Sequence, residues 1–259
     1  MSTAVLDPVH PAALKRQPLF NVPAVITALA ALMLVIHGVR ALMSQDADIE
    51  TLALFAFIPA RYDPSIITDG VLPGGTGADI WTFVTYALLH GDITHIGVNL
   101  LWMLAFGSPV ARRFGTLRFL AFFAITAAAG AAAHLVTHPN ELVPMIGASA
   151  AISGCMAAAI RFVFATHGFE GLRPDGFEAV VRRPAAPLSV VLRDRRVIGF
   201  VAVWFVINLA FGLGAPVGAE TGTIAWQAHI GGFLAGLLLF PLFDPVARRT
   251  EPFPRGEGY

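Results

Sequence analysis

The chain has 259 residues and few charges, with 17 basic and 17 acidic side chains. Charged residues make up 13% of the sequence and hydrophobic residues 56%, whereas an average soluble domain has about 25% charged residues. This composition excludes a disordered chain, and the net charge of zero provides no overall attraction to nucleic acid. The single cysteine, Cys155, excludes an internal disulfide. The composition therefore favours a membrane protein.

Six stretches without Asp, Glu, Lys or Arg predict six transmembrane helices. A helix of about 20 residues crosses a bilayer and satisfies its own backbone hydrogen bonds in lipid. The stretches are 17–39, 93–111, 119–140, 142–160, 197–219 and 221–243. The predicted fold class is an all-α polytopic membrane protein. Because the first stretch is long and lacks a clean small-residue cleavage site, we interpret it as a retained anchor rather than a signal peptide.

The segments outside these spans are expected to be interfacial or exposed. A membrane domain over 17–243 would lie between an N-terminal tail, 1–16, and a C-terminal tail, 244–259. The short apolar run 51–60 is too short to span, and 80–91 leads into the second span. The other two segments are a polar, basic loop at 166–196 and a glycine-rich loop at 212–222.

The distribution of basic residues predicts the orientation in the membrane. If the N-terminus is cytoplasmic, 15 of the 17 basic residues fall on the cytoplasmic side, and only Arg40 and Arg61 fall outside. The opposite topology reverses this count, so the positive-inside rule favours cytoplasmic tails at both ends. We expect an integral protein of a bacterial inner or plasma membrane.

Two predicted spans contain polar side chains that could act together in catalysis. Ser149 lies at the start of the fourth span, after Gly147, and His229 lies in the sixth. Gly232 and Gly236 form a small-xxx-small pattern, which allows close helix packing on the face that carries His229. Packing through small faces would bring Ser149 to His229, and a histidine is the usual base that activates a serine. No Asp or Glu lies in a span near His229, so the sequence predicts a dyad.

The second span supplies candidate groups for stabilising an oxyanion. His95 and Asn99 are four residues apart, so they share one helix face. Acyl transfer requires hydrogen-bond donors directed at the developing oxyanion. Those two side chains and the backbone N–H of Ser149, at a helix N-terminus, could provide them.

Together, these motifs resemble the signature motifs of the rhomboid intramembrane serine proteases, over roughly residues 20–243. The matching segments are Gly147-Ala-Ser149-Ala, Ala228-His229-Ile-Gly-Gly232 and His90…His95…Asn99. The resemblance implies a six-helix rhomboid-like bundle with Ser149 as nucleophile and His229 as general base. It also implies an oxyanion hole formed by His95, Asn99 and the Ser149 amide, with His90, Gly147, Gly232 and Gly236 in structural roles.

The resemblance also implies a function. Members of the family cleave transmembrane segments of membrane proteins near the outer face of the bilayer, through an acyl-enzyme. They need no metal or cofactor. The expected partners are transmembrane substrates and the lipid bilayer, with no nucleic acid. Residues 212–222 would cap the site, and the fifth span, near Trp204 and Phe205, would act as a lateral gate.

Three other interpretations remain open at this stage. The family usually has glycine after the nucleophile, but this chain has Ala150, which favours an inactive relative that binds transmembrane helices. A zinc site formed by His90, His95 and His229 would leave the serine unexplained, and only Asp92 could serve as a nearby carboxylate. A small transporter would fit six spans, but the sequence lacks paired broken helices and an intramembrane carboxylate.

Overall fold

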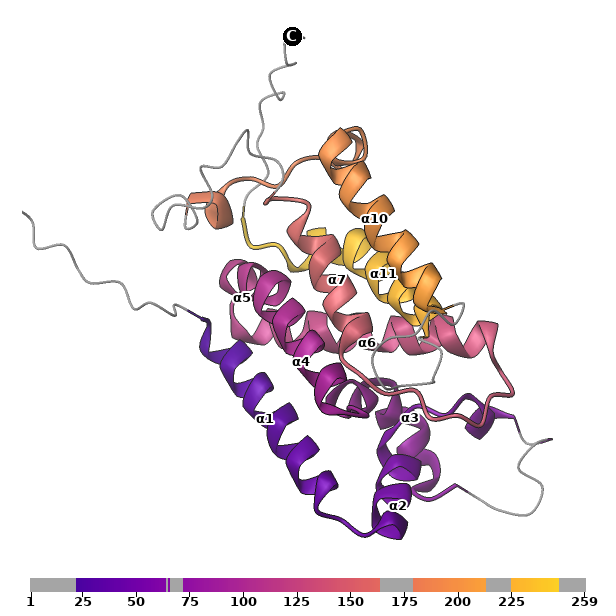
Figure 1. Ribbon diagram of the computed structural model, residues 1–259. Coiled ribbons are helices and arrows are strands. Elements are labelled where there is room, and N and C mark those ends of the chain that lie inside the picture. The colour runs from indigo at the N-terminus through magenta and orange to yellow at the C-terminus, as the bar shows by residue number, and fades with distance from the viewer. Residues whose placement is uncertain (1–21, 64, 66–71, 164–178, 213–224, 247–259) are drawn as a thin grey trace, which may run out of the picture.

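The computed structural model describes residues 22–63, 65, 72–163, 179–212 and 225–246, and these residues form a bundle of helices (Figure 1). In these described ranges there is no strand; one isolated antiparallel bridge joins Phe57 to Met145. The expected all-α polytopic class is confirmed. Residues 1–16, 166–178, 213–222 and 247–259, which belong to the predicted tails, basic loop and cap, lie outside the described part.

Helices occur within all six predicted spans, and shorter helices connect them. The helices near the N-terminus are α1 (Ala24–Ala41), α2 (Gln45–Phe55), η1 (Pro59–Tyr62), α3 (Gly75–Thr85) and η2 (Tyr86–Leu88). The second span is a continuous helix made of α4 (Ile93–Trp102), the π-helical turn η3 (Met103–Gly107) and α5 (Ser108–Phe114). The remaining helices are α6 (Thr116–Thr137), α7 (Ser149–Ala159), α9 (Leu188–Val191), α10 (Arg195–Gly212) and α11 (Trp226–Phe243).

Among the described residues, four helices are long and apolar enough to cross a membrane: α1, Ile93–Phe114, α6 and α11. The fourth predicted span, 142–160, is helical only over the 11 residues of α7. A helix of 11 residues is about 17 Å long, well short of the roughly 30 Å hydrocarbon core. The absence of charge at 142–148 reflects a non-helical segment rather than a helix. The fifth helix, α10, begins at Arg195, two residues earlier than the predicted span.

α7 lies in the middle of the bundle, with α4 and α5 on one side and α10 and α11 on the other (Figure 1). It packs closely against both α6 and α11. Every residue from Ala150 to Ala159 is buried, and most of them are alanine, glycine or serine. Such small side chains let helix backbones approach closely, which is how helices associate in lipid without a hydrophobic driving force.

A buried ion pair joins α5 to the end of α11 at the predicted cytoplasmic end of the bundle. The Arg113 guanidinium donates to both carboxylate oxygens of Asp244 at 2.8 Å. It also donates to the carbonyl oxygens of Val181 and Arg183, each at 2.7 Å. Because four of the five N–H groups of this guanidinium donate to fixed partners, the pair holds three segments of the chain together.

At the opposite end, the segment before α7 is held by the first part of the chain. Phe57 and Met145 exchange backbone hydrogen bonds of 3.1 and 2.8 Å, and the Ala60 amide donates to the Glu141 carbonyl oxygen at 3.0 Å. The Gly147 amide donates to the Tyr86 carbonyl oxygen at 3.0 Å. These hydrogen bonds fix the position of the segment that leads into α7, and therefore the position of Ser149 at its start.

Candidate active site

Ser149 and His229 lie in contact although they are 80 residues apart in the sequence. His229 Nε2 is 2.7 Å from Ser149 Oγ, a normal hydrogen-bond distance. Ser149 is the first residue of α7, and His229 lies in the first turn of α11. Both side chains are half-buried. The arrangement has the geometry of a serine with an adjacent general base.

Asn208, on α10, is a third member of this arrangement that the sequence analysis did not identify. Its side-chain oxygen forms a hydrogen bond with His229 Nδ1. Its side-chain NH₂ donates to the Trp204 carbonyl oxygen at 2.7 Å. Because a carbonyl oxygen can only accept a hydrogen bond, this contact fixes which end of the amide is the NH₂ and which is the oxygen. Asn208 is the only Asn, Gln, His, Ser or Thr in the stretch 197–219. A search for polar side chains within the spans could therefore have found it.

His95, on α4, lies beside the segment that precedes the N-terminal end of α7. A Cβ atom built on Gly147 would lie 2.6 Å from His95 Nε2 and 3.8 Å from Ser149 Oγ. Gly147 also has a φ of +116°, which side chains disfavour, so glycine is required at this position for two separate reasons. The Gly91 amide donates to His95 Nδ1 at 3.4 Å. This tautomer leaves the proton on Nε2, the atom that faces Gly147.

Asn99 and His90 lie near His95 without direct contact with the serine in the described interactions. The buried Asn99 side chain donates to the His95 carbonyl oxygen at 3.0 Å, one turn earlier on α4. The His90 ring lies edge-on to the His95 ring with centroids 5.1 Å apart. The His90 carbonyl oxygen accepts from Arg40 at 2.9 Å, and Arg40 in turn pairs with Asp48 at 2.7 Å. These contacts hold the segment before α4 against α1 and α2.

The two glycines of the predicted seam lie where α11 crosses α7. A Cβ atom at Gly232 would lie 2.7 Å from the Ala150 carbonyl carbon, and one at Gly236 would lie 2.6 Å from the Gly154 Cα. Backbones this close leave no room for a methyl group at either position. The crossing brings the first turn of α11, with His229, alongside the start of α7.

Comparison with known proteins places this helical bundle in a family. The family model for the Rhomboid domain matches residues 77–244, more than half of the chain. The chain belongs to the rhomboid family. It is 26% identical over 203 residues to the rhomboid protease GlpG of Pectobacterium atrosepticum, covering 78% of this chain and 62% of that protein.

Other rhomboid relatives show similar identity over shorter regions. The rhomboid protease GluP of Bacillus subtilis is 28% identical over 156 residues, covering 60% of this chain and 24% of that protein. The rhomboid-like protease 3 of Toxoplasma gondii is 27% identical over 186 residues, covering 71% of this chain and 58% of that protein. This rhomboid chain therefore spans less than two thirds of each of these three relatives.

The residue after Ser149 in this rhomboid chain, Ala150, packs against α6. A Cβ atom at Gly130, on α6, would lie 2.5 Å from the Ala150 Cβ. The Ala150 methyl group therefore fills space that the glycine on α6 leaves open, and Ala150 is only 1% exposed. The methyl group is part of the α6–α7 interface.

The zinc interpretation of His90, His95 and His229 finds no support in the described geometry. Among the described residues, only one group of at least three His, Cys, Asp or Glu side chains brings its ligand atoms together, and it contains none of these three. His229 instead contacts Ser149 and Asn208 through its two ring nitrogens.

The helix crossing at Gly232 yields a testable prediction. Gly232→Ala should destabilise the rhomboid bundle by about 1–3 kcal/mol, the usual cost of overpacking a close interface. Unfolding of the purified protein in mixed micelles would measure the effect. Gly38→Ala on α1 is the matched control, because a Cβ there meets nothing within 4 Å. Equal stability of the two variants would contradict the close crossing.

Proposed function

We propose that this protein is an intramembrane serine endopeptidase that cleaves transmembrane segments of other membrane proteins. The observation that carries the proposal is the 2.7 Å contact between His229 Nε2 and Ser149 Oγ. Membership of the rhomboid family, with relatives named rhomboid proteases, supports the same assignment. In this proposal Ser149 is the nucleophile and His229 the general base.

Asn208 supports the protonation state that the base requires. Because its amide NH₂ is directed at the Trp204 carbonyl oxygen, its oxygen faces His229 Nδ1 and accepts a hydrogen bond from the N–H there. The imidazole then presents an unprotonated Nε2 to the serine hydroxyl. As Ser149 Oγ attacks the scissile carbonyl carbon, its proton moves to Nε2, and the imidazolium later protonates the leaving amine. Water then hydrolyses the acyl-enzyme by the same route in reverse.

The oxyanion of the tetrahedral intermediate would lie at the start of α7. The first N–H groups of a helix have no acceptor within the helix and carry the positive end of its dipole. The Ser149 amide is one of them. His95 Nε2, beside Gly147, is a second candidate donor from α4. The Asn99 side chain donates to the His95 carbonyl oxygen, and this hydrogen bond stabilises the first turns of α4.

The position of α10 supports its proposed role as a lateral gate for the substrate. The Trp204 ring stacks on the Phe233 ring of α11 at 5.0 Å, and the Phe205 ring meets Trp226 edge-on at 6.5 Å. Val203, Val206 and Ile207 face outward and are 47–62% exposed. Ring contacts of this kind can separate without breaking a backbone hydrogen bond. Since α10 also carries Asn208, opening of the gate would release the contact that orients His229.

The proposed topology places this end of the bundle on the outer side of the membrane. The site residues lie where α4, α7 and α11 begin and α10 ends, whereas Arg113 and Asp244 lie at the opposite end. Most basic residues in the described part of the chain lie at that opposite end, as the positive-inside rule requires of a cytoplasmic face. A short α7 would then start below the outer surface of the bilayer.

Labelling with an activity-based probe tests the proposal directly. A fluorophosphonate should modify Ser149 and leave Ser153 unmodified, because the Ser153 hydroxyl donates to the Ser149 carbonyl oxygen at 2.7 Å and forms no hydrogen bond with a basic side chain in the described part of the chain. Mass spectrometry of the labelled peptides would identify the site. Labelling that survives in His229→Ala at the wild-type rate, or that falls on Ser153, would contradict the proposed mechanism.

A further inference from the structure

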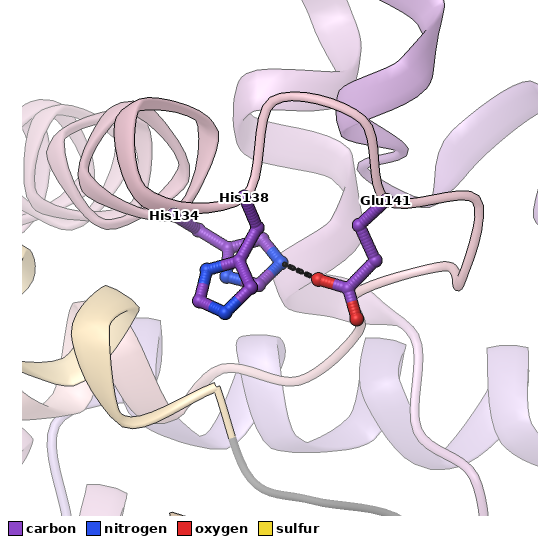
Figure 2. Close-up of side chains that lie close together, drawn as sticks. All are labelled: His134, His138 and Glu141. Carbon is purple, nitrogen blue, oxygen red and sulfur yellow. Dashed lines mark ion pairs between the residues drawn. The ribbon is translucent and has the colours of Figure 1, made fainter. Parts of the chain in front are cut away.

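Two histidines and a glutamate converge at the end of α6, away from the proposed catalytic residues. His134 and His138 are four residues apart at the C-terminal end of this helix, and Glu141 follows in the next segment (Figure 2). One ligand atom from each of the three lies within 4.8 Å of the others. In the described part of the chain, no other group of His, Cys, Asp or Glu side chains converges in this way.

The surroundings of His138 leave one ring nitrogen available as a metal ligand. The Thr137 hydroxyl donates to the carbonyl oxygens of Ala133 and His134, at 2.9 and 3.0 Å. With the hydroxyl proton directed to these carbonyls, the Thr137 oxygen accepts in the 2.9 Å contact with His138 Nδ1, in the tautomer that carries its proton on Nδ1. His138 Nε2 is then unprotonated. Metal-bound histidines commonly have this arrangement, with the second ring nitrogen donating to a neighbouring oxygen.

His134 and Glu141 are already at the separation of two ligands of one ion. His134 Nε2 is 3.1 Å from Glu141 Oε2, the contact drawn as a dashed line in Figure 2. Two ligands at zinc bond lengths of about 2.0–2.2 Å, in tetrahedral geometry, are about 3.4 Å apart. The His134 side chain is 6% exposed and that of Glu141 30% exposed, so one side of the cluster is open to solvent. An ion could enter from that side.

We propose that His134, His138 and Glu141 bind a divalent transition-metal ion of the zinc class, with water in the fourth position. Two imidazoles and one carboxylate are a common ligand set for this class of ion. The site is separate from Ser149 and His229 and takes no part in the chemistry proposed for them.

The site would stabilise the segment that leads to Ser149. The Glu141 carbonyl oxygen accepts from Ala60, and Met145 pairs with Phe57 on the same segment. A bound ion would add a third attachment by joining Glu141 to the end of α6. Because the ion binds the folded chain, it should raise the melting temperature of the protein.

A titration with Co²⁺ alone tests the site. The full-length, untagged protein in detergent micelles should bind one Co²⁺ per chain and develop the visible absorption bands of a tetrahedral nitrogen–oxygen site. His138→Ala and Glu141→Gln should each weaken binding by more than about 10-fold, since even the loss of a group that only orients a ligand costs about 10–100-fold. His37→Ala and Glu50→Gln, on α1 and α2, are controls that should bind as the wild type does.

A variant that keeps all three ligands tests the site even if the ligand variants misfold. Thr137 is exposed, and Thr137→Val removes only the hydroxyl that orients His138. It should weaken Co²⁺ binding about 10–100-fold. Zn²⁺ alone should raise the melting temperature of the wild type and leave that of His138→Ala unchanged. Absence of Co²⁺ absorption in the wild type, or equal affinity in the wild type and His138→Ala, would show that the cluster is an ordinary ion pair.

Discussion

Ser149→Ala should abolish cleavage of transmembrane substrates by the reconstituted protein, with a loss of at least about 10³-fold. The substitution removes the only hydroxyl in contact with His229 among the described interactions. His229→Ala should cause a similar loss, because the two groups act in one step and their effects do not add. The measurement is the initial rate of cleavage in lipid vesicles, with a panel of single-span substrates.

Two comparisons make this experiment decisive. Ser153→Ala, one turn along the same helix, removes a hydroxyl that donates only to the backbone, and it should retain most of the wild-type rate. Cleavage that persists in Ser149→Ala or in His229→Ala would refute the proposed dyad. Capture of substrates by the wild type without cleavage would instead identify an inactive rhomboid-like binder.

Asn208→Leu should lower kcat about 10²-fold while leaving KM nearly unchanged. Leucine has a similar volume but cannot accept a hydrogen bond from His229 Nδ1, and displacing a catalytic group by about 1 Å costs about that factor in rate. Asn208→Asp should recover part of kcat, because a carboxylate oxygen can accept the same hydrogen bond. The fluorophosphonate labelling rate of Ser149 should follow kcat in both variants.

These readouts distinguish a positioning role from a structural one. Ile207→Ala, next to Asn208 but facing outward and 47% exposed, is the matched control and should leave kcat unchanged. If Asn208 only anchored α10, its substitution would change the melting temperature and KM, and Asn208→Asp would restore nothing. Equal kcat in Asn208→Leu and the wild type would mean that the imidazole is oriented without α10.

Much of the fold follows from the distribution of charge in the sequence. Helices occur in all six charge-free stretches, because an apolar segment in lipid has to satisfy its backbone internally. The length of α7 did not follow from that pattern. Residues 142–148 are as free of strong charge as α7 itself, yet they are non-helical and bonded to other segments through Met145 and Gly147. Hydropathy does not distinguish a span from an apolar segment that is enclosed by protein.

For the candidate site, the spacing of the motifs identified candidate residues but did not determine which side chains are in contact. The Ser149–His229 pair was expected from the small residues on α7 and α11, because glycines at i and i+4 mark a close crossing. Asn208 was missed because the search for a third group was limited to carboxylates. Its partner, His229, lies 21 residues further along the chain, and no local period connects the two. The convergence of His134, His138 and Glu141 likewise depends on the turn that ends α6.

The sequence by itself determined that this is a polytopic helical membrane protein, and its motif types and spacing indicated a rhomboid. It did so because lipid penalises charge and unpaired backbone groups wherever they lie along the chain. Only the tertiary structure decided which polar groups meet. A contact such as Asn208–His229 or His134–Glu141 depends on the crossing of helices and the direction of turns, which arise from packing of the whole bundle. The same packing adds Asn208 to the predicted pair, so that Ser149, His229 and Asn208 form a continuous chain of hydrogen bonds.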